Sequence, residues 1–579
     1  VEVESDAILT ATATQLNTLQ VTGSGGVIVT DISAKLDANL SGIATSGTNI
    51  VDFIDDITFT GTLPGADTII TALNSDSILI TLSNSTMFNA SNTYTLSGDI
   101  SVNTVGSTIT ANDISGLNGS NLFITKLEST TDLSGIDMHT DSLFTVLVED
   151  TMTFTGHLES TNGINPTVTI SNNVVFTASA DLIDNLIISG AGTVVVTDVS
   201  SASDLSSITT TGGNVVEFSF NTFDKFLPKA DTTLASSDGT SRDISLTDPG
   251  VMASGFTYTL SGDIDLSIPQ AGITGKDISG ASGSTLTVTD LSSTTDLSSV
   301  DMHVDSSFTA VVDLSMTFTG HLISTNGINP DISLQPDVDF TVSAELITGV
   351  PVIGGPTNQF IVDDLSSTTD LSSVNMHVDS SFTAVVDTSM TFTGHLISTA
   401  GDINPDISLQ NGVHFTASAD LIDGLNITTG TDTKLIINEL TETCDLSGIN
   451  KQGDGTFIVV VDNSITFIGT LTSNVGGITP DLSINSGAEL TISAELIDTL
   501  NISAGSNSGL IITDLSSTSD LSSIYMPTDS SFTGIVDQSM TFIGHLISTV
   551  GGRNPDISLQ PDVDFTVTAE LITGVPVLG

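Results

Sequence analysis

The chain has 579 residues, of which 68 are acidic and 9 are basic, and its net charge is −59. Hydrophobic residues make up 38% and charged residues only 13%, with a mean hydropathy of +0.29, which is unlike the composition of a disordered chain. Nine basic side chains cannot supply the basic patches of a nucleic-acid binder. No apolar run approaches the roughly 18 residues of a membrane span, and one cysteine, Cys444, excludes an intrachain disulfide framework.

Internal repeats run through the whole chain at two spacings. TYTLSGDI begins at Thr93 and again at Thr257, and MTFTGHL repeats over the same long interval, from Met152 to Met316. Related MTF or ITF segments then recur at a shorter and nearly constant interval, at Met390, Ile465 and Met540. We therefore expect two long units, three short units and a partial unit in one continuous solenoid, at 1–166, 167–330, 331–405, 406–480, 481–555 and 556–579.

Alternating apolar and polar residues are the dominant local pattern within the units. In DISLQPDVDFTVS, which begins at Asp331, Ile332, Leu334 and Phe340 have one parity and the polar residues between them have the other. In MTFTGHL, Met390 and Phe392 are the residues expected to point inward. A period of two predicts strands with one buried face, and the abundance of Thr, Val and Ile favours strands over helices.

The spacing of these strands indicates how they stack. Each short unit divides into three pieces of about 25 residues that resemble one another, whereas a β-sandwich domain needs about 100 residues. Dipeptides typical of hairpin turns are sparse between the strands. We therefore predict an all-β fold, a parallel β-solenoid (β-helix) with coils of about 25 residues and three coils per short repeat.

Acidic residues recur at fixed positions of the repeat. Oxygen ligands from adjacent coils could bind Ca²⁺ weakly along the whole surface, and this is the one ion that the sequence favours. The alternative interpretation is that Asp fills turn corners, where its side chain bonds the local backbone. No calcium-loop motif is present. The candidate cation ligands are Asp296, Asp313, Asp370, Asp387, Asp462, Asp520 and Asp537.

Histidines come in pairs with a constant spacing, as in His303 and His321 or His377 and His395. Such a pair could bind zinc from neighbouring coils. However, another copy has Gln452 and Thr470 at these positions, so we favour solvent-exposed histidines.

Catalytic chemistry is poorly supported by the sequence. Paired carboxylates could hydrolyse a glycan, but they are spread evenly along the repeats. Lys and Arg are scarce, Trp is absent, and no motif of a nucleophile, phosphate loop or metalloprotease occurs. We therefore predict that the protein is not an enzyme and needs no cofactor except weakly bound Ca²⁺.

Both ends of the sequence resemble ordinary coils. Residues 1–24 have the pattern of a first coil, residues 556–579 have that of a further coil, and neither has a cap. Either copies stack head to tail, or adjacent repeats of a longer chain continue the stack. A first residue other than Met is also expected of a processed or truncated chain.

Segments such as AELITGV, FTASADLIDGLNIT and TVVVTDVSSASDLSSI resemble the acidic repeat proteins that bacteria export, including giant adhesins, surface-layer proteins and extracellular filament proteins. The resemblance implies secretion, a cell-surface or matrix location, and contact with cell surface or matrix. It leads us to expect a structural subunit of an extracellular filament, fibre or surface layer. The alternative is a carbohydrate-binding or depolymerising β-helix of the tailspike or adhesin type.

Overall fold

The computed structural model describes residues 1–73, 77–399, 401, 403–474, 478–498 and 500–579. The chain divides into two compact units. Unit 1 comprises 1–288, 299–308 and 324–328, and unit 2 comprises 289–298, 309–323 and 329–579. The division falls at the end of the predicted second long unit, 167–330. Among the described residues, no helix has the length and apolar character required to cross a membrane.

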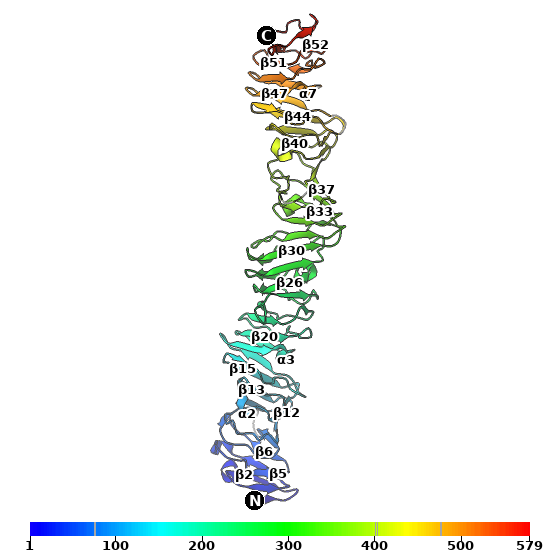
Figure 1. Ribbon diagram of the computed structural model, residues 1–579. Helices are drawn as coiled ribbons and strands as arrows, with labels where there is room; N and C mark the ends of the chain where they lie inside the picture. The colour runs from blue at the N-terminus through cyan, green and yellow to red at the C-terminus, as the bar shows by residue number, and fades with distance from the viewer. Residues whose placement is uncertain (74–76, 400, 402, 475–477, 499) are drawn as a thin grey trace. The chain divides into compact units, whose positions relative to one another are not determined.

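Each unit is a stack of parallel coils, which confirms the predicted β-solenoid. About 42% of the residues are in strands and 5% in helices, and the coils number about 26. Strand partners come from successive coils, as where Asp339 pairs with Gln359 and Gln359 with Ser381, all in parallel. Within each unit of Figure 1 the chain colour changes steadily from coil to coil, so each coil lies beside its neighbours in sequence.

Three long sheets lie entirely within unit 1, and their strands come mostly from alternate positions in the chain. The first contains β2 (Ile8–Thr12), β4 (Gly26–Thr30), β6 (Asn49–Asp52), β8 (Thr68–Thr71), β10 (Thr93–Leu96), β12 (Asp113–Gly116) and β14 (Ile136–Met138). The second contains β7 (Ile57–Phe59), β9 (Ile78–Leu82), β11 (Ile100–Val105), β13 (Asn121–Lys126), β15 (Leu143–Val148), β17 (Thr167–Ile170) and β19 (Ile188–Gly190). The third contains β16 (Met152–Thr153), β18 (Val175–Ser179), β20 (Thr193–Val199), β21 (Asn214–Phe218), β23 (Thr232–Ser236), β25 (Thr257–Leu260), β27 (Asp277–Gly280) and β29 (Val300–Met302).

Unit 2 repeats this arrangement, and each sheet is named here by its first strand. The β31 sheet contains β31 (Met316–Phe318), β33 (Asp339–Ser343), β35 (Gln359–Asp363), β37 (Ser381–Val386), β39 (Asp406–Leu409), β41 (Ile427–Thr429) and β43 (Ile449–Asn450). The β38 sheet contains β38 (Met390–Thr391), β40 (His414–Ser418), β42 (Lys434–Asn438), β44 (Thr456–Val461), β46 (Asp481–Ile484), β48 (Asn501–Ala504) and β50 (Ile524–Tyr525). The β45 sheet contains β45 (Ile465–Phe467), β47 (Glu489–Ser493), β49 (Gly509–Thr513), β51 (Ser531–Val536), β53 (Asp556–Leu559) and β55 (Val577–Leu578), and β52 (Met540–Phe542) pairs with β54 (Phe565–Val567).

The interior of the coils is filled by the apolar side of most strands. Ile332, Leu334 and Phe340 are all buried, as the alternation predicts. Phe392 is buried too, whereas Met390 is only half-buried, so the inward prediction holds for one of the two. Phenylalanines stack from coil to coil, with ring centroids 6.1 Å apart between Phe340 and Phe360. Such ladders contribute both buried area and ring stacking to the cohesion of adjacent coils.

Single helical turns form a corner of many coils, which the strand pattern did not predict. In the sequence AELI, the alanine and the isoleucine face the interior, and Ala344 and Ile347 are fully buried. The glutamate lies in the first turn, where a negative charge is favourable. These helices are α1 (Ala13–Leu16), α2 (Gly106–Ile109), α3 (Ala180–Ile183), α4 (Gln270–Ile273), α5 (Ala344–Ile347), α6 (Ala419–Ile422) and α7 (Ala494–Ile497).

The short repeat is longer than three coils of this solenoid. The ladder that starts at Met316 reaches Phe382 after three coils, before the chain arrives at Met390, the equivalent of Met316 in the next repeat. The coils are therefore slightly shorter than predicted, and the equivalent strands β31, β38, β45 and β52 each begin a separate sheet. Equivalent side chains of neighbouring repeats lie at different positions around the axis, and they do not form one straight stripe.

The first long unit contains an additional strand that begins a new sheet in this way. In unit 1, β7 and β16 each stand at the end of a sheet, and they belong to ITFTGTL at 57–63 and MTFTGHL at 152–158. The 1–166 unit therefore holds two sheet starts of the ITF or MTF type rather than one. The similarity of these two heptapeptides was the sequence signal for this finer division.

Candidate functional site

Three of the seven predicted cation ligands lie in tight turns. Asp296, Asp370 and Asp520 each accept a hydrogen bond at 2.9 Å from the backbone N–H two residues ahead. Hydrogen bonding by the serine at that position holds the pKa of each carboxyl below its usual value. Asp commonly occupies such turns. One carboxylate oxygen of each residue therefore already accepts a hydrogen bond from the local backbone.

The same three residues also have a histidine neighbour in the adjacent coil. Bridges in parallel orientation join Asp296 to His321, Asp370 to His395 and Asp520 to His545. The imidazole of His545 lies 3.8 Å from the carboxylate of Asp520, measured between Nδ1 and Oδ2. A protonated histidine would therefore be attracted to this corner, which the sequence interpretation did not anticipate.

The other four predicted ligands follow the longest strand of each repeat. Asp313, Asp387 and Asp537 are exposed, and Asp462 is half-buried. Asp462 is already well bonded, because it accepts the backbone N–H of Glu439 at 2.9 Å and the amide of Asn485 at 2.5 Å. The remaining three present carboxylates to solvent.

One of these carboxylates meets a second acid across the coil boundary. Asp387 lies within hydrogen-bonding reach of Asp364, and this contact raises the pKa of Asp364 above its usual value. Burial, followed by the charge of Asp387, raises the pKa of Asp363 as well. Asp364 adopts a left-handed backbone with φ of 54°, which Asp tolerates better than most residues.

Elsewhere in the repeats the equivalent corner contains a lysine side chain. Lys126 in the first long unit occupies the position that Asp290 has in the second. Its ammonium group lies 2.7 Å from the carboxylate of Asp150, in the neighbouring coil. The corner can thus be built with opposite charges, and the contact between Asp364 and Asp387 is the acidic version of it.

The fit of these residues to a calcium ion is limited. Calcium takes six to eight oxygen ligands, and in the described part of the chain no three His, Cys, Asp or Glu side chains gather to hold a metal. Pairs of carboxylates such as Asp364 and Asp387 offer two side-chain ligands. Among the described residues, the acidic side chains thus meet as pairs and not as a cluster of three or more.

The paired histidines lie in two different settings, and all are exposed, as predicted. His303 and His377 each accept, at Nδ1, the backbone N–H of the aspartate two residues ahead, at 3.1 Å. Their partners His321 and His395 stand instead beside the turn aspartates.

The terminal coils have incompletely covered interiors. Val577 in β55 is 41% exposed, whereas its equivalent Val352 is fully buried. Phe565 is half-buried, although its equivalent Phe340 is fully buried. At the other end Leu9 in β2 is half-exposed. A further coil of the same kind would cover both sets of side chains.

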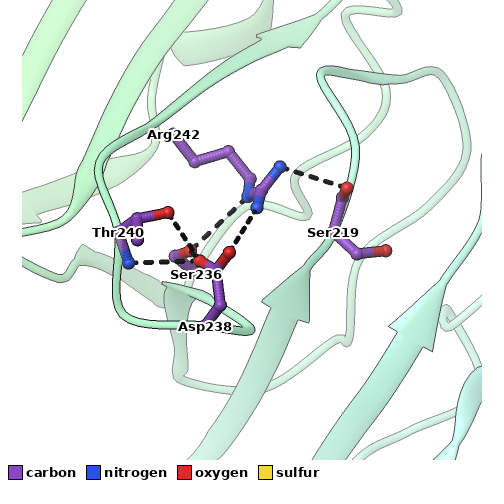
Figure 2. A network of polar contacts seen from close by, with 5 residues as sticks. All are labelled: Ser219, Ser236, Asp238, Thr240 and Arg242. Carbon is purple, nitrogen blue, oxygen red and sulfur yellow. Dashed lines mark hydrogen bonds and ion pairs between the residues drawn. The ribbon is translucent and has the colours of Figure 1, made fainter.

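A network around Arg242 fixes one corner of unit 1 (Figure 2). Arg242 donates to the carbonyl oxygen of Ser219 at 3.1 Å and to Asp238 at 3.3 Å. Asp238 also accepts hydrogen bonds from Thr240 and Ser236, which together hold its pKa far below the usual value. Sequence reasoning did not anticipate this network, which stabilises the turn between β23 and β24 (Arg242–Leu246).

Shallow grooves lie on the outer faces of the sheets, and one of them contains an exposed aromatic ring. In unit 2 a groove of about 500 Å³ runs over β44, β46, β48 and β50 and is lined by Asp481, Asn501, Ser503 and Tyr525. Tyr525 is 43% exposed, whereas Tyr94 and Tyr258 are fully buried. Sequence reasoning missed this groove, although a tyrosine where the other short repeats have Asn375 or Asn450 was a visible signal.

Comparisons with known proteins leave the family open. No protein-family model matches the chain, and no curated protein matches it. Among solved structures, the chain is similar to "Plant peptide hormone receptor RGFR1 in complex with RGF2" with 9% sequence identity, a TM-score of 0.17 and coverage of 93% of each chain. A TM-score this low carries no functional argument.

Proposed function

We propose that the protein is a non-enzymatic structural subunit of a secreted extracellular filament, fibre or surface layer, in which coils stack head to tail. The observation that carries this proposal is the incomplete cover of the terminal coils. Val577, a core position, is 41% exposed, while Val352 in the same place of an internal coil is fully buried. Covering such positions with another coil would bury apolar surface worth about 25 cal/mol per Å².

Backbone groups favour the same association. A terminal coil has a row of N–H and C=O groups without a neighbouring strand on one side, and such edges pair readily with another chain. Contact between the first coil of one copy and the last coil of the next is heterologous, so it propagates. The occupant of the open edge is thus a coil of the same type, supplied by a second copy or by further repeats.

The surface charge supplies a condition for this assembly. A net charge of −59 repels other copies at low ionic strength. Calcium bound weakly along the acidic corners, including the one formed by Asp364 and Asp387, would lower this repulsion. Assembly is therefore expected to depend on calcium or on high salt, as in a saline environment outside the cell.

Negative-stain electron microscopy and sedimentation velocity test the proposal on the purified chain, with calcium and with a chelator. Filaments or long oligomers are expected with calcium, and shorter species with the chelator. Isolated single particles at high protein and calcium concentrations would refute self-association.

A matched pair of variants locates the contact. V577K places a charge at the open core position, and V304K places the same charge at a turn residue that is 75% exposed. V577K should abolish the oligomers and V304K should leave them intact. Circular dichroism of both variants checks that the internal coils are unchanged.

The alternative role, a carbohydrate-binding or depolymerising β-helix, is favoured by one observation, the exposed tyrosine in the groove over β44 to β50. A structural role does not specify which molecule the protein contacts, and the groove indicates the chemical class of such a partner.

A further inference from the structure

The groove at Tyr525 differs from its counterpart one repeat earlier by two outward residues, a tyrosine for an asparagine and a serine for a threonine. Outward side chains of successive strands form two rows across it, because Asp481 pairs with Asn501, Ser483 with Ser503, and Ser503 with Tyr525. One repeat earlier the same two rows are made by Asp406 and Asn426 and by Ser408, Thr428 and Asn450. The phenol therefore replaces an amide at the end of an otherwise similar polar face.

The polar part of the groove is already arranged. The side-chain amide of Asn501 donates to Oδ1 of Asp481 at 2.9 Å, and the equivalent pair, Asn426 and Asp406, has the same bond at 2.8 Å. This bond orients the Asn501 amide and leaves its carbonyl oxygen pointing away from the carboxylate. Asp481, Asn501 and Ser503 are all exposed, so their acceptors and hydroxyl are accessible to a ligand.

Tyr525 has a setting unlike that of the other tyrosines. The hydroxyl groups of Tyr94 and Tyr258 are buried and donate to the carbonyl oxygens of Pro64 and Pro228, both at 2.9 Å, so these rings are structural. Tyr525 instead lies at the end of the groove beside Val550, which is 57% exposed. An aromatic ring beside a few hydrogen-bonding groups in a groove is a combination typical of ligand sites.

We propose that this groove binds a sugar residue of a neutral or amino-bearing glycan. One face of the sugar ring stacks on the Tyr525 phenol, and its hydroxyl groups bond to Asp481, Asn501 and Ser503. The carboxylate of Asp481 and the net charge of −59 repel uronates and sulfated sugars. The inference identifies the matrix partner as a glycan. It rests on the proposed function only for the extracellular location, and glycan binding itself does not require filament formation.

Isothermal titration calorimetry on the full chain tests the site, with the glucosamine tetramer and cellotetraose as probes and trigalacturonate as the charged control. The chelator-treated, unassembled protein is used, so the failure of filament formation and the failure of glycan binding are separate results. We expect one site per chain for the glucosamine tetramer or cellotetraose, and at least tenfold weaker binding of trigalacturonate.

Two variants use the repeats as matched controls. Y525N restores the residue found at Asn450 and should weaken binding at least tenfold without unfolding the coil, which circular dichroism verifies. N450Y transplants the ring onto the equivalent face and should raise the stoichiometry to two. Unchanged binding by Y525N, one site in N450Y, no binding of either uncharged or amino probe at about 10 mM, or equal binding of trigalacturonate would each overturn the proposal.

Discussion

Gly394 packs directly against the backbone of the preceding coil, and a Cβ atom there would lie well within 3.0 Å of the carbonyl oxygen of Thr369. The same close approach recurs in neighbouring repeats, between Gly320 and Thr295 and between Gly544 and Ser519. The φ of Gly394 lies outside the left-handed region, so the residue is needed for space. The glycine of the TGHL segment thus sets how closely two coils stack.

Gly394→Ala is expected to destabilise the coils on both sides of it by about 2–3 kcal/mol, since a backbone oxygen cannot move aside as a side chain can. Unfolding of a repeat protein is not a single transition. Hydrogen exchange of residues 365–396 is therefore the appropriate measurement, and it should accelerate locally.

Gly534→Ala is the matched control for this substitution. Gly534 in β51 occupies the position that Ala310 and Ala384 have in other repeats, and a Cβ there would meet the flexible Leu515 side chain at 2.8 Å. Exchange should be unchanged or slower in this variant. Unaltered exchange in Gly394→Ala would contradict the role of the close approach.

The turn at Asp370 predicts a dependence on pH. Because the pKa of Asp370 in the folded chain is held below its ordinary value by Ser372, its contribution to stability is present at neutral pH and is lost as the pH falls through that lowered pKa. Asp370→Ala should cost about 0.5–1.5 kcal/mol at pH 7 and make the local stability insensitive to this titration.

Asp370→Asn separates the turn from the charge. The amide oxygen of Asn can accept the same N–H bond from Ser372, so this variant should keep most of the stability at pH 7. Hydrogen exchange of residues 370–373 between pH 3 and 7, corrected for the intrinsic rates, provides the comparison. Equal losses in the alanine and asparagine variants would show that the hydrogen bond is not the source.

The solenoid could be predicted because alternation along each strand records which side faces the interior. Ile332 and Phe340 have the parity of buried residues, and both are buried. What the pattern does not contain is the length of a coil, which depends on corners such as α5 and on the turns between strands. A difference of a few residues per coil moves equivalent side chains to another face, so β31 and β38 begin different sheets.

The candidate sites depend on coil length for the same reason. Asp364 and Asp387 meet because the chain completes one coil between them, and repeat spacing alone could not pair them. The turn role of Asp370 was one of two interpretations that the sequence left open, and the hydrogen bond to Ser372 establishes it without testing cation binding. The sequence did not show that Tyr525 lines the same groove as Asp481, because their proximity depends on how the coils stack.

Cys444 provides a test of how a repeat position tolerates substitution. It is fully buried, and burial raises the pKa of its thiol to about 12. The equivalent Thr369 accepts the backbone N–H of Ser366 at 3.0 Å. Cys444→Thr should form the matching bond with Thr441 and stabilise the coil by about 0.5–1.5 kcal/mol, as measured by hydrogen exchange of residues 441–446.

Cys444→Ala serves as the comparison, because it removes the sulfur without adding an acceptor and should be destabilising. The wild-type thiol should also react with Ellman's reagent only after the coil opens. If Cys444→Thr were no more stable than Cys444→Ala, the hydroxyl would not be making the turn bond seen at Thr369.

The contact between Asp364 and Asp387 gives the last prediction. Because the pKa of Asp364 is raised in the folded chain, folding binds extra protons, and the repulsion weakens stability at neutral pH. Asp387→Asn should therefore stabilise the coil at pH 7 by a few tenths of a kcal/mol after solvent screening. The advantage should shrink as the pH falls through the raised pKa, since protonation relieves the wild-type chain.

Asp387→Lys extends this test, because it opposes a cation to Asp364 as Lys126 is opposed to Asp150. It should stabilise the coil at least as much as Asp387→Asn, and the gain should decline in high salt. Asp454→Asn, in an exposed turn before β44, removes the same charge elsewhere and is the control. If all three variants gained the same stability at low salt, net charge rather than this contact would govern stability. The corner of Asp364 and Asp387 would then not be a preferred place for a cation.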